Sequence, residues 1–198
     1  DPPFAETAIG CENCHGPGRK HAGSGRRGDI VNPARLPRAR AEEICMNCHQ
    51  GGDARVYMPG KQETDFRPGQ RLADVVAIFQ AGRTGETDLL QHHEAMRESA
   101  CFQKSANLSC HTCHNPHAAK TDHNATCASC HKTLAASHPR GPDCVNCHMP
   151  KRDIGFIAHS ALTNHRISRG APAARSAGLR QINEGPAPAP LTLLQAYG

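Results

Sequence analysis

The stretch SCHTCHNPHAAKTDHNATCASCHK, residues 109–132, contains four cysteines and five histidines in a regular order. It holds two copies of the pattern Cys-x-x-Cys-His, the second beginning 17 positions after the first. The chain carries five copies in all, at residues 11–15, 45–49, 110–114, 127–131 and 144–148. These copies use ten of the eleven cysteines. The remaining one, Cys101, is either a buried thiol or an intermolecular crosslink.

Each Cys-x-x-Cys pair is compatible with three chemistries. Structural zinc is held by two such pairs, or by one pair and two histidines, in a closed tetrahedron. A redox-active dithiol uses one pair, usually at the N-terminus of a helix. Covalent haem attachment uses the two thiols for thioether bonds to the porphyrin edge, and the histidine that follows directly binds the iron.

The adjacent histidine distinguishes among these chemistries. Histidine accounts for 14 of the 198 residues, yet it follows the second cysteine in every copy. Zinc does not require that placement, whereas haem attachment does. We therefore predict five haem c groups. The thioether residues are Cys11, Cys14, Cys45, Cys48, Cys110, Cys113, Cys127, Cys130, Cys144 and Cys147, and the proximal iron ligands are His15, His49, His114, His131 and His148.

The composition indicates an interior that side chains alone fill poorly. The chain has no Trp, two Tyr and five Phe, but 18 Gly and 15 Pro. Covalent haem accounts for this, because burying roughly a few hundred Å² of macrocycle at about 25 cal/mol per Å² contributes on the order of 10 kcal/mol per haem. The net charge of +5 comes from scattered basic residues, so we expect no nucleic-acid partner. No apolar run reaches the length of a membrane span.

We expect a mostly irregular chain with short α-helices and little or no β-sheet. Residues 37–44 predict a helix that leads into the second Cys-x-x-Cys-His copy. The apolar run at 75–79 predicts a helix around residues 72–80, and apolar residues at helical spacing predict another over 87–102. After Pro150 we expect mostly loop. The Pro/Ala-rich tail, residues 168–198, is expected to be extended and to pack on the domain or on a neighbouring subunit.

A haem iron that only transfers electrons needs a second axial ligand. Outside the five copies lie His21, His92, His93, His111, His117, His123, His138, His159 and His165. Methionine is a weak competitor, because Met46 and Met149 lie within or directly after haem motifs. Met58 and Met96 are the only others, so we predict histidine as both axial ligands of all five irons.

The sequence resembles multihaem c-type cytochromes, in particular a branch often joined to tetratricopeptide repeats. That branch is similar to cytochromes that carry electrons in ammonia oxidisers and to those that build extracellular filaments. The resemblance covers residues 11–167. The matching segments are CENCHGPGRKH at 11–21, DFRPG at 65–69, HHEAM at 92–96, SAC at 99–101, CHNPH at 113–117, CHMP at 147–150 and TNHRI at 163–167.

The resemblance implies a pentahaem cytochrome c domain over residues 1–167, wrapped around its cofactors. It also implies the distal ligands His21, His92, His117, His138 and His165, with His159, His93 and His123 as alternates. Members of the branch usually carry one further motif upstream. One distal histidine could therefore serve a haem in an adjacent subunit.

We predict electron transfer along a chain of closely spaced haems, with other redox proteins as partners. A sharper hypothesis is a subunit of a filament or larger redox complex in which the haems continue into a neighbour. The alternative is an enzyme that converts nitrogen compounds at one open iron, but all five motifs end in His and nine histidines are spare. Haem attachment takes place outside the cytoplasm, so we expect a periplasmic or extracellular protein. The sequence opens with DPPFAET, which indicates either a mature product whose leader has been removed or a fragment.

Overall fold

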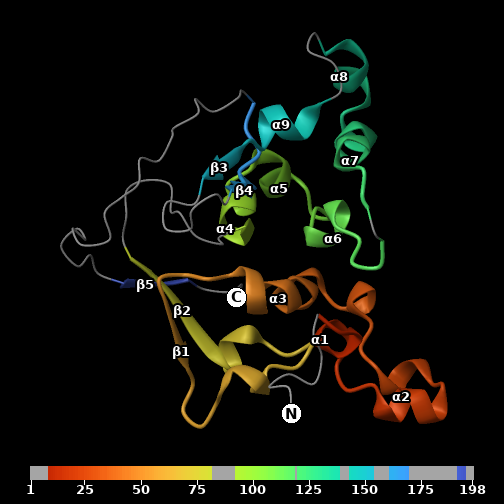
Figure 1. Cartoon of the computed structure of the whole chain (residues 1–198), viewed down its shortest axis with the longest axis vertical. Coiled ribbons are helices and arrows are strands. Elements are labelled where there is room, and N and C mark those ends of the chain that lie inside the picture. The colour runs from red at the N-terminus through yellow and green to blue at the C-terminus, as the bar shows by residue number, and fades with distance from the viewer. Residues whose placement is uncertain are drawn as a thin grey trace. The chain divides into compact units, whose positions relative to one another are not determined.

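A computed structural model describes residues 9–81, 92–118, 120–138, 143–153, 161–169 and 191–194 (Figure 1). The chain forms two compact units. The first unit comprises residues 1–81 and 191–198, and the second unit comprises residues 82–190. The longest helix in the described ranges has 12 residues, and much of the backbone is irregular. The predicted fold class, a mostly irregular chain with short helices and little sheet, is confirmed.

The helices of the first unit are short and mostly end at glycine or at a haem motif. They are α1 (Cys11–His15), α2 (Arg19–Ser24) and α3 (Arg38–His49), with 3-10 turns η1 (Arg27–Asp29), η2 (Pro33–Arg35), η3 (Glu63–Asp65) and η4 (Leu72–Asp74). Helix α3 begins directly after Pro37, which confirms the helix predicted over residues 37–44. Helix α2 ends where Gly25 adopts a φ of 64°, a left-handed conformation that glycine adopts without strain.

A three-stranded antiparallel sheet forms the other half of the first unit. The strands are β1 (Ala54–Tyr57), β2 (Val76–Ala81) and β5 (Leu191–Leu194), in the order β1-β2-β5. The helix predicted around residues 72–80 is therefore wrong beyond η4. The β-branched side chains Val76 and Ile78 favour extended backbone, and because they alternate along the strand both enter the interior, where they are 2% and 3% exposed.

The first unit has a core made of its own side chains. The core residues are Met46, Phe66, Leu72, Val75, Val76 and Ile78, with Tyr57 packed against them. This cluster corrects the expectation of a poorly filled interior for this part of the chain. Gly52 allows the close approach beside it: a Cβ there would lie 2.6 Å from Ile78 Cγ2, and its φ is 64°.

The second unit consists of short helices and one two-stranded sheet. Its elements are α4 (His92–Arg97), α5 (Ala100–Lys104), α6 (Cys110–Cys113), α7 (His123–Cys130), α8 (Lys132–Ser137), α9 (Cys144–His148), β3 (Lys151–Asp153) and β4 (Ala161–Thr163). Strands β3 and β4 pair antiparallel, which corrects the expectation of mostly loop after Pro150. Lys151 lies opposite Thr163, so the backbone after the last motif is held by ladder hydrogen bonds.

The helix predicted over residues 87–102 is interrupted. Residues 92–97 form α4 and residues 100–104 form α5, but Ser99 between them has extended backbone, with φ −75° and ψ 134°. Residues 87–91 of that prediction lie outside the described residues. Buried apolar side chains are scarce in this unit: within its described residues they are Met96 and Phe102.

The C-terminal tail contributes β5 to the first unit, where Leu193 lies opposite Phe79. Residues 170–190 and 195–198 lie outside the described residues, so the predicted division into residues 1–167 and 168–198 stays a prediction. Within the described ranges, no helix is long and apolar enough to span a bilayer.

Candidate haem sites

All five Cys-x-x-Cys-His copies lie on helical turns. The first is α1, the second ends α3, the third is α6 with His114 as its C-terminal cap, the fourth ends α7 with His131 as the cap, and the fifth is α9. Residues three apart share a face of a helix, so each turn presents its two thiols on one side. The Cys-x-x-Cys part of every repeat is thus helical, whereas the following histidine is helical in three copies and has non-helical backbone at His114 and His131.

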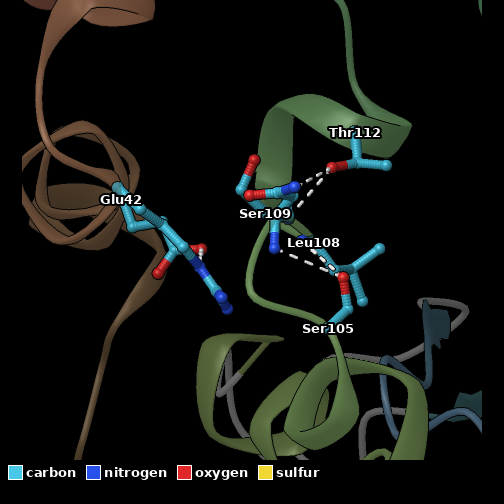
Figure 2. A network of polar contacts seen from close by, with 7 residues as sticks. Glu42, Ser105, Leu108, Ser109 and Thr112 are labelled. Atoms are coloured by element: carbon cyan, nitrogen blue, oxygen red, sulfur yellow. Dashed lines mark hydrogen bonds and ion pairs between the residues drawn. The ribbon is translucent and has the colours of Figure 1, made fainter.

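Polar side chains fix where these helical turns begin. The backbone N–H of Ser109 donates to Thr112 Oγ1 at 3.0 Å at the start of α6, and Leu108 N–H donates to Ser105 Oγ at 3.1 Å just before it (Figure 2). At the start of α7 the Asp122 carboxylate accepts from the N–H of Ala125 at 2.9 Å. These contacts satisfy backbone donors that have no partner within the helix.

Long-range contacts hold the second and fifth motifs. Arg55 donates to the carbonyl oxygens of Gln50 and Asn47, at 2.7 and 3.0 Å, at the C-terminal end of α3. A cation there satisfies terminal carbonyls and complements the negative end of the helix. In the second unit, Val145 N–H donates to Asn124 Oδ1 at 3.1 Å, so a residue of α7 caps the start of α9.

In the first unit the thiols of the first two motifs lie close together. Burial raises the pKa of the Cys14 thiol, and the neighbouring thiols of Cys45, Cys48 and Cys11 raise it further. Charges separated by more than about 10 Å are largely screened from one another in salt solution, so this influence indicates proximity. Two motifs that are 34 positions apart in the sequence therefore adjoin.

The three motifs of the second unit form a similar group. Burial raises the pKa of the Cys127 thiol to about 11, helped by Cys144, Cys113 and Cys101, and Cys127 also shares a hydrogen bond with Cys144. Burial likewise raises the pKa of Cys113, with smaller contributions from Cys101 and Cys130. The third motif thus adjoins the fourth, and the fourth adjoins the fifth. Cys101, half-buried, lies among them.

Two proximal histidines are held by backbone carbonyl groups. His15 Nδ1 lies 2.8 Å from the carbonyl oxygen of Val31, and Val31 N–H donates back to the His15 carbonyl at 3.1 Å. His148 Nδ1 lies 2.5 Å from the carbonyl oxygen of Ser168. A carbonyl oxygen only accepts, so in the neutral imidazole Nδ1 carries the proton and Nε2 carries the lone pair. That is the tautomer in which Nε2 can bind a metal ion.

Two predicted distal ligands have the same arrangement. His21 Nδ1 lies 2.8 Å from the carbonyl oxygen of Arg26, and His165 Nδ1 lies 3.0 Å from that of Thr163. Both imidazoles are thereby oriented with Nε2 as the metal-binding nitrogen. In four of the ten predicted iron ligands, Nδ1 thus lies within hydrogen-bond distance of a backbone carbonyl oxygen.

The structure brings several predicted ligands together in the second unit. The ring centroids of His114 and His165 are 6.1 Å apart, with the planes 26° from parallel. Those of His138 and His148 are also 6.1 Å apart, with the planes at 78°. Two imidazoles that bind one metal ion from opposite sides, each at about 2 Å, have centroids about 6 Å apart. Each pair joins a predicted proximal ligand to a predicted distal one.

Two further histidines lie beside the pair formed by His114 and His165. His92 is 4.1 Å from His165 between ring centroids, too close for the two to flank one metal ion. His123, an alternate from the sequence, is 5.1 Å from His114 in an edge-to-face arrangement. His93, another alternate, is buried on α4 with Nδ1 3.5 Å from Glu94 Oε1.

Three other predicted ligands lie on the surface, and one alternate falls outside the described residues. His49, His117 and His131 are exposed, and Asn115 Oδ1 accepts from the His117 N–H at 3.0 Å in the turn after the third motif. His159 lies outside the described residues. Nowhere in the described ranges do three or more His, Cys, Asp or Glu side chains gather as a metal-binding group.

The residues present fit haem c. A porphyrin supplies four of the iron ligands itself, so the chain has to provide a pair of thiols and one or two imidazoles at each site. The five motif turns place their thiols in half-buried or exposed positions. The oriented His15 and His148 stand at the end of two of these turns.

Comparisons with known proteins support a relationship with the multihaem c-type cytochromes. Over 125 residues the chain is 29% identical to multiheme cytochrome MtrA of Shewanella baltica (strain OS185). The match covers 58% of this chain and 37% of that protein, so the chain spans well under half of the relative's length. No family model matches the chain. No solved structure matches it either.

Proposed function

We propose that the chain binds five haem c groups covalently and transfers electrons between them. The observation that carries this proposal is the fivefold repetition of one helical turn, in which two thiols share a face and a histidine follows. The ten thioether residues and five proximal ligands named from the sequence are retained in the proposal. The similarity to a multihaem cytochrome supports it independently.

We pair two of the proximal ligands with distal ones. His114 with His165, and His148 with His138, have the ring separation that bis-histidine ligation requires. The Nδ1 contacts of His148 and His165 support this pairing, because they present Nε2 as the ligand atom. His21 is proposed as a distal ligand in the first unit on the same ground. His92 and His117 remain proposals from the resemblance.

Haem iron supplies reversible one-electron chemistry when bound. The chain's own contribution is to hold neighbouring sites close together and to fix the axial ligands. Neighbouring motifs adjoin in each unit, because Cys45 contributes to the raised pKa of Cys14, and Cys144 forms a hydrogen bond with Cys127 and contributes to its raised pKa. Where two histidines would hold the haem, as we propose for His114 with His165 and for His148 with His138, the iron would have no position open to a substrate, which favours a carrier over an enzyme.

Low-temperature EPR of the ferric protein tests this function. We expect low-spin signals for all five irons and no substantial high-spin signal. His165→Ala and His138→Ala should each convert one site to high spin, because removal of one axial imidazole leaves that iron with a weak ligand. His111→Ala is the matched control, since it is an exposed histidine on α6 that we do not assign as a ligand.

The variants also discriminate between pairings. His123→Ala should leave the signals unchanged; if it, and not His165→Ala, produced the high-spin signal, our assignment for the third motif would be wrong. A high-spin iron in the unaltered protein would favour an enzyme with an open site.

We extend the proposal to the surroundings of the chain. Electrons would enter and leave through other redox proteins, in the periplasm or outside the cell, because haem is attached outside the cytoplasm. Assembly into a filament stays a prediction from the sequence. Negative-stain imaging and native mass measurement test it: filaments or ordered oligomers support it, and only monomers contradict it.

A further inference from the structure

A buried serine joins two distant parts of the second unit. Ser99 is 1% exposed and lies between α4 and α5, at the point where the predicted long helix is interrupted. Its hydroxyl accepts a hydrogen bond from the N–H of Ile167 at 2.8 Å and lies 3.2 Å from the carbonyl oxygen of His165. These partners are 68 and 66 positions away in the sequence. The Ser99 hydroxyl therefore forms hydrogen bonds with the backbone on both sides of Arg166.

Other contacts hold the same segment, the residues on either side of His165. Arg166 Nε forms an ion pair with Glu98 at 3.1 Å, directly beside Ser99. Arg166 N–H donates to the side chain of the buried Asn164 at 2.9 Å. The ion pair is exposed on both sides and contributes little, so the buried Ser99 hydroxyl is the stronger connection.

The same segment is tied at both ends to the fifth motif region. Asn164 N–H donates to the carbonyl oxygen of Pro150 at 3.1 Å, and Ser168 N–H donates to that of His148 at 3.3 Å. These bonds fix residues 164 and 168, and the Ser99 hydroxyl holds the turn between them together with the Asn164 side chain. The His165 ring projects from that turn towards the rings of His92 and His114.

We propose that Ser99 is a positioning residue that holds His165 in place as the distal ligand of the third haem site. It acts through the backbone of residues 165–167 and does not touch the iron. The inference rests on the proposed function, since it requires His165 to bind iron. The Ser99 hydroxyl also lies 3.5 Å from the carbonyl oxygen of Ala95 in α4, so it connects that helix to residues 165–167.

The test uses the complete haem-loaded protein and cyanide, which competes with a weakly held distal ligand at ferric iron. We expect Ser99→Ala to bind cyanide at one site about tenfold faster than the unaltered protein, as the loss of a buried hydrogen bond of this kind predicts. The haem count should stay unchanged. Ser99→Thr should restore the rate to within about twofold, since threonine keeps the hydroxyl and tolerates this extended, cap-like backbone.

Ser105→Ala is the matched control. Its hydroxyl also accepts from backbone N–H groups, those of Asn107 and Leu108, which lie two and three positions further along the same turn. It should lower the thermal midpoint without a change in the cyanide rate. An equal rate increase in Ser105→Ala would mean that any loosening of the unit releases the ligand, and would overturn the inference.

Two negative results are distinguishable. If His165→Ala opens one iron but Ser99→Ala binds cyanide at the unaltered rate, the positioning role is wrong and the proposed function stands. If His165→Ala itself leaves the EPR signals unchanged, the ligand assignment has failed, and the inference fails with it.

Discussion

The two units of the chain differ in how many apolar side chains fill their interiors. The first unit, with two haem motifs, has a six-residue apolar core and a three-stranded sheet. The second unit, with three motifs, has only Met96 and Phe102 as buried apolar side chains within its described residues. Its order comes from side chain to backbone contacts, such as those of Ser99 and Asn124.

This difference indicates which unit depends more on its cofactors. Hydrogen bonds contribute little net stability compared with apolar burial, so a unit without an apolar core needs another source of buried surface. Covalently attached haem provides that surface in our account. On the proposed function, the first unit would combine haem with a conventional core, whereas the second unit would rely on haem for most of its interior.

The largest expected effect comes from removing the attachment thiols of one unit at a time. Changing the six motif cysteines of the second unit to alanine should reduce amide protection there to that of an unfolded chain, because little apolar core remains. Changing the four motif cysteines of the first unit should leave measurable protection in β1, β2 and α3, whose core is intact. Hydrogen exchange read by mass spectrometry measures both. Equal loss of protection in the two variants would contradict the comparison.

A core substitution in the first unit should have the next largest effect. Leu72 is 1% exposed in the cluster, and Leu72→Ala is expected to destabilise the first unit by about 2–5 kcal/mol. Denaturant unfolding, followed by hydrogen exchange in β2, measures the change. Val56→Ala serves as the control because Val56 is 54% exposed on the neighbouring strand, so it should cost well under half as much. A Leu72→Ala protein as stable as the control would show that haem, and not this cluster, holds the first unit together.

The smallest expected effect on stability comes from removing an electrostatic contact of Asp29. The pKa of Asp29 is lowered from 3.8, mainly by its hydrogen bonds with Lys20 and Ser24, at 2.5 and 2.6 Å. A lowered pKa means that the contact stabilises the folded state above pH 3.8 and that the contribution is lost as pH falls through the folded-state value. Asp29→Asn should therefore lower the thermal midpoint slightly at neutral pH and not at strongly acidic pH.

A second surface pair provides the control for this prediction. Asp74 is paired more loosely, with Arg71 at 4.0 Å and both side chains more than half exposed. Asp74→Asn should change the midpoint less than Asp29→Asn does at neutral pH. A larger change in Asp74→Asn, or a difference for Asp29→Asn that persists in acid, would contradict the assignment.

Local sequence patterns predicted the features that depend on local interactions. The helix after Pro37 and the broad fold class followed from residue spacing and composition. The strand at 76–81 was missed because a short apolar run suits a buried strand as well as a helix, and its β-branched residues were the available signal. Pairing with β1 decides that these residues form a strand and not a helix. A local sequence pattern carries no information about such pairing.

The same limit applies to the candidate haem sites, where contacts between residues distant in the sequence could not be predicted. The motifs predict the attachment cysteines and proximal histidines directly, and this assignment stays a prediction. The roles of Ser99 and Asn124 could not be predicted, because their partners are 68 and 21 positions away. The carbonyl groups of Val31 and Ser168, which orient His15 and His148, carry no sequence signal at all, since every residue has one.

The proposed function depends most of all on the number of haems attached to the protein. Intact mass spectrometry of the denatured protein, together with a pyridine haemochrome spectrum, counts covalent haems without reference to fold or activity. The account predicts the polypeptide mass plus five haem groups and a spectrum typical of two thioether bonds per haem. A colourless protein with the mass of its amino acids alone, or one that carries zinc in place of haem, would contradict it.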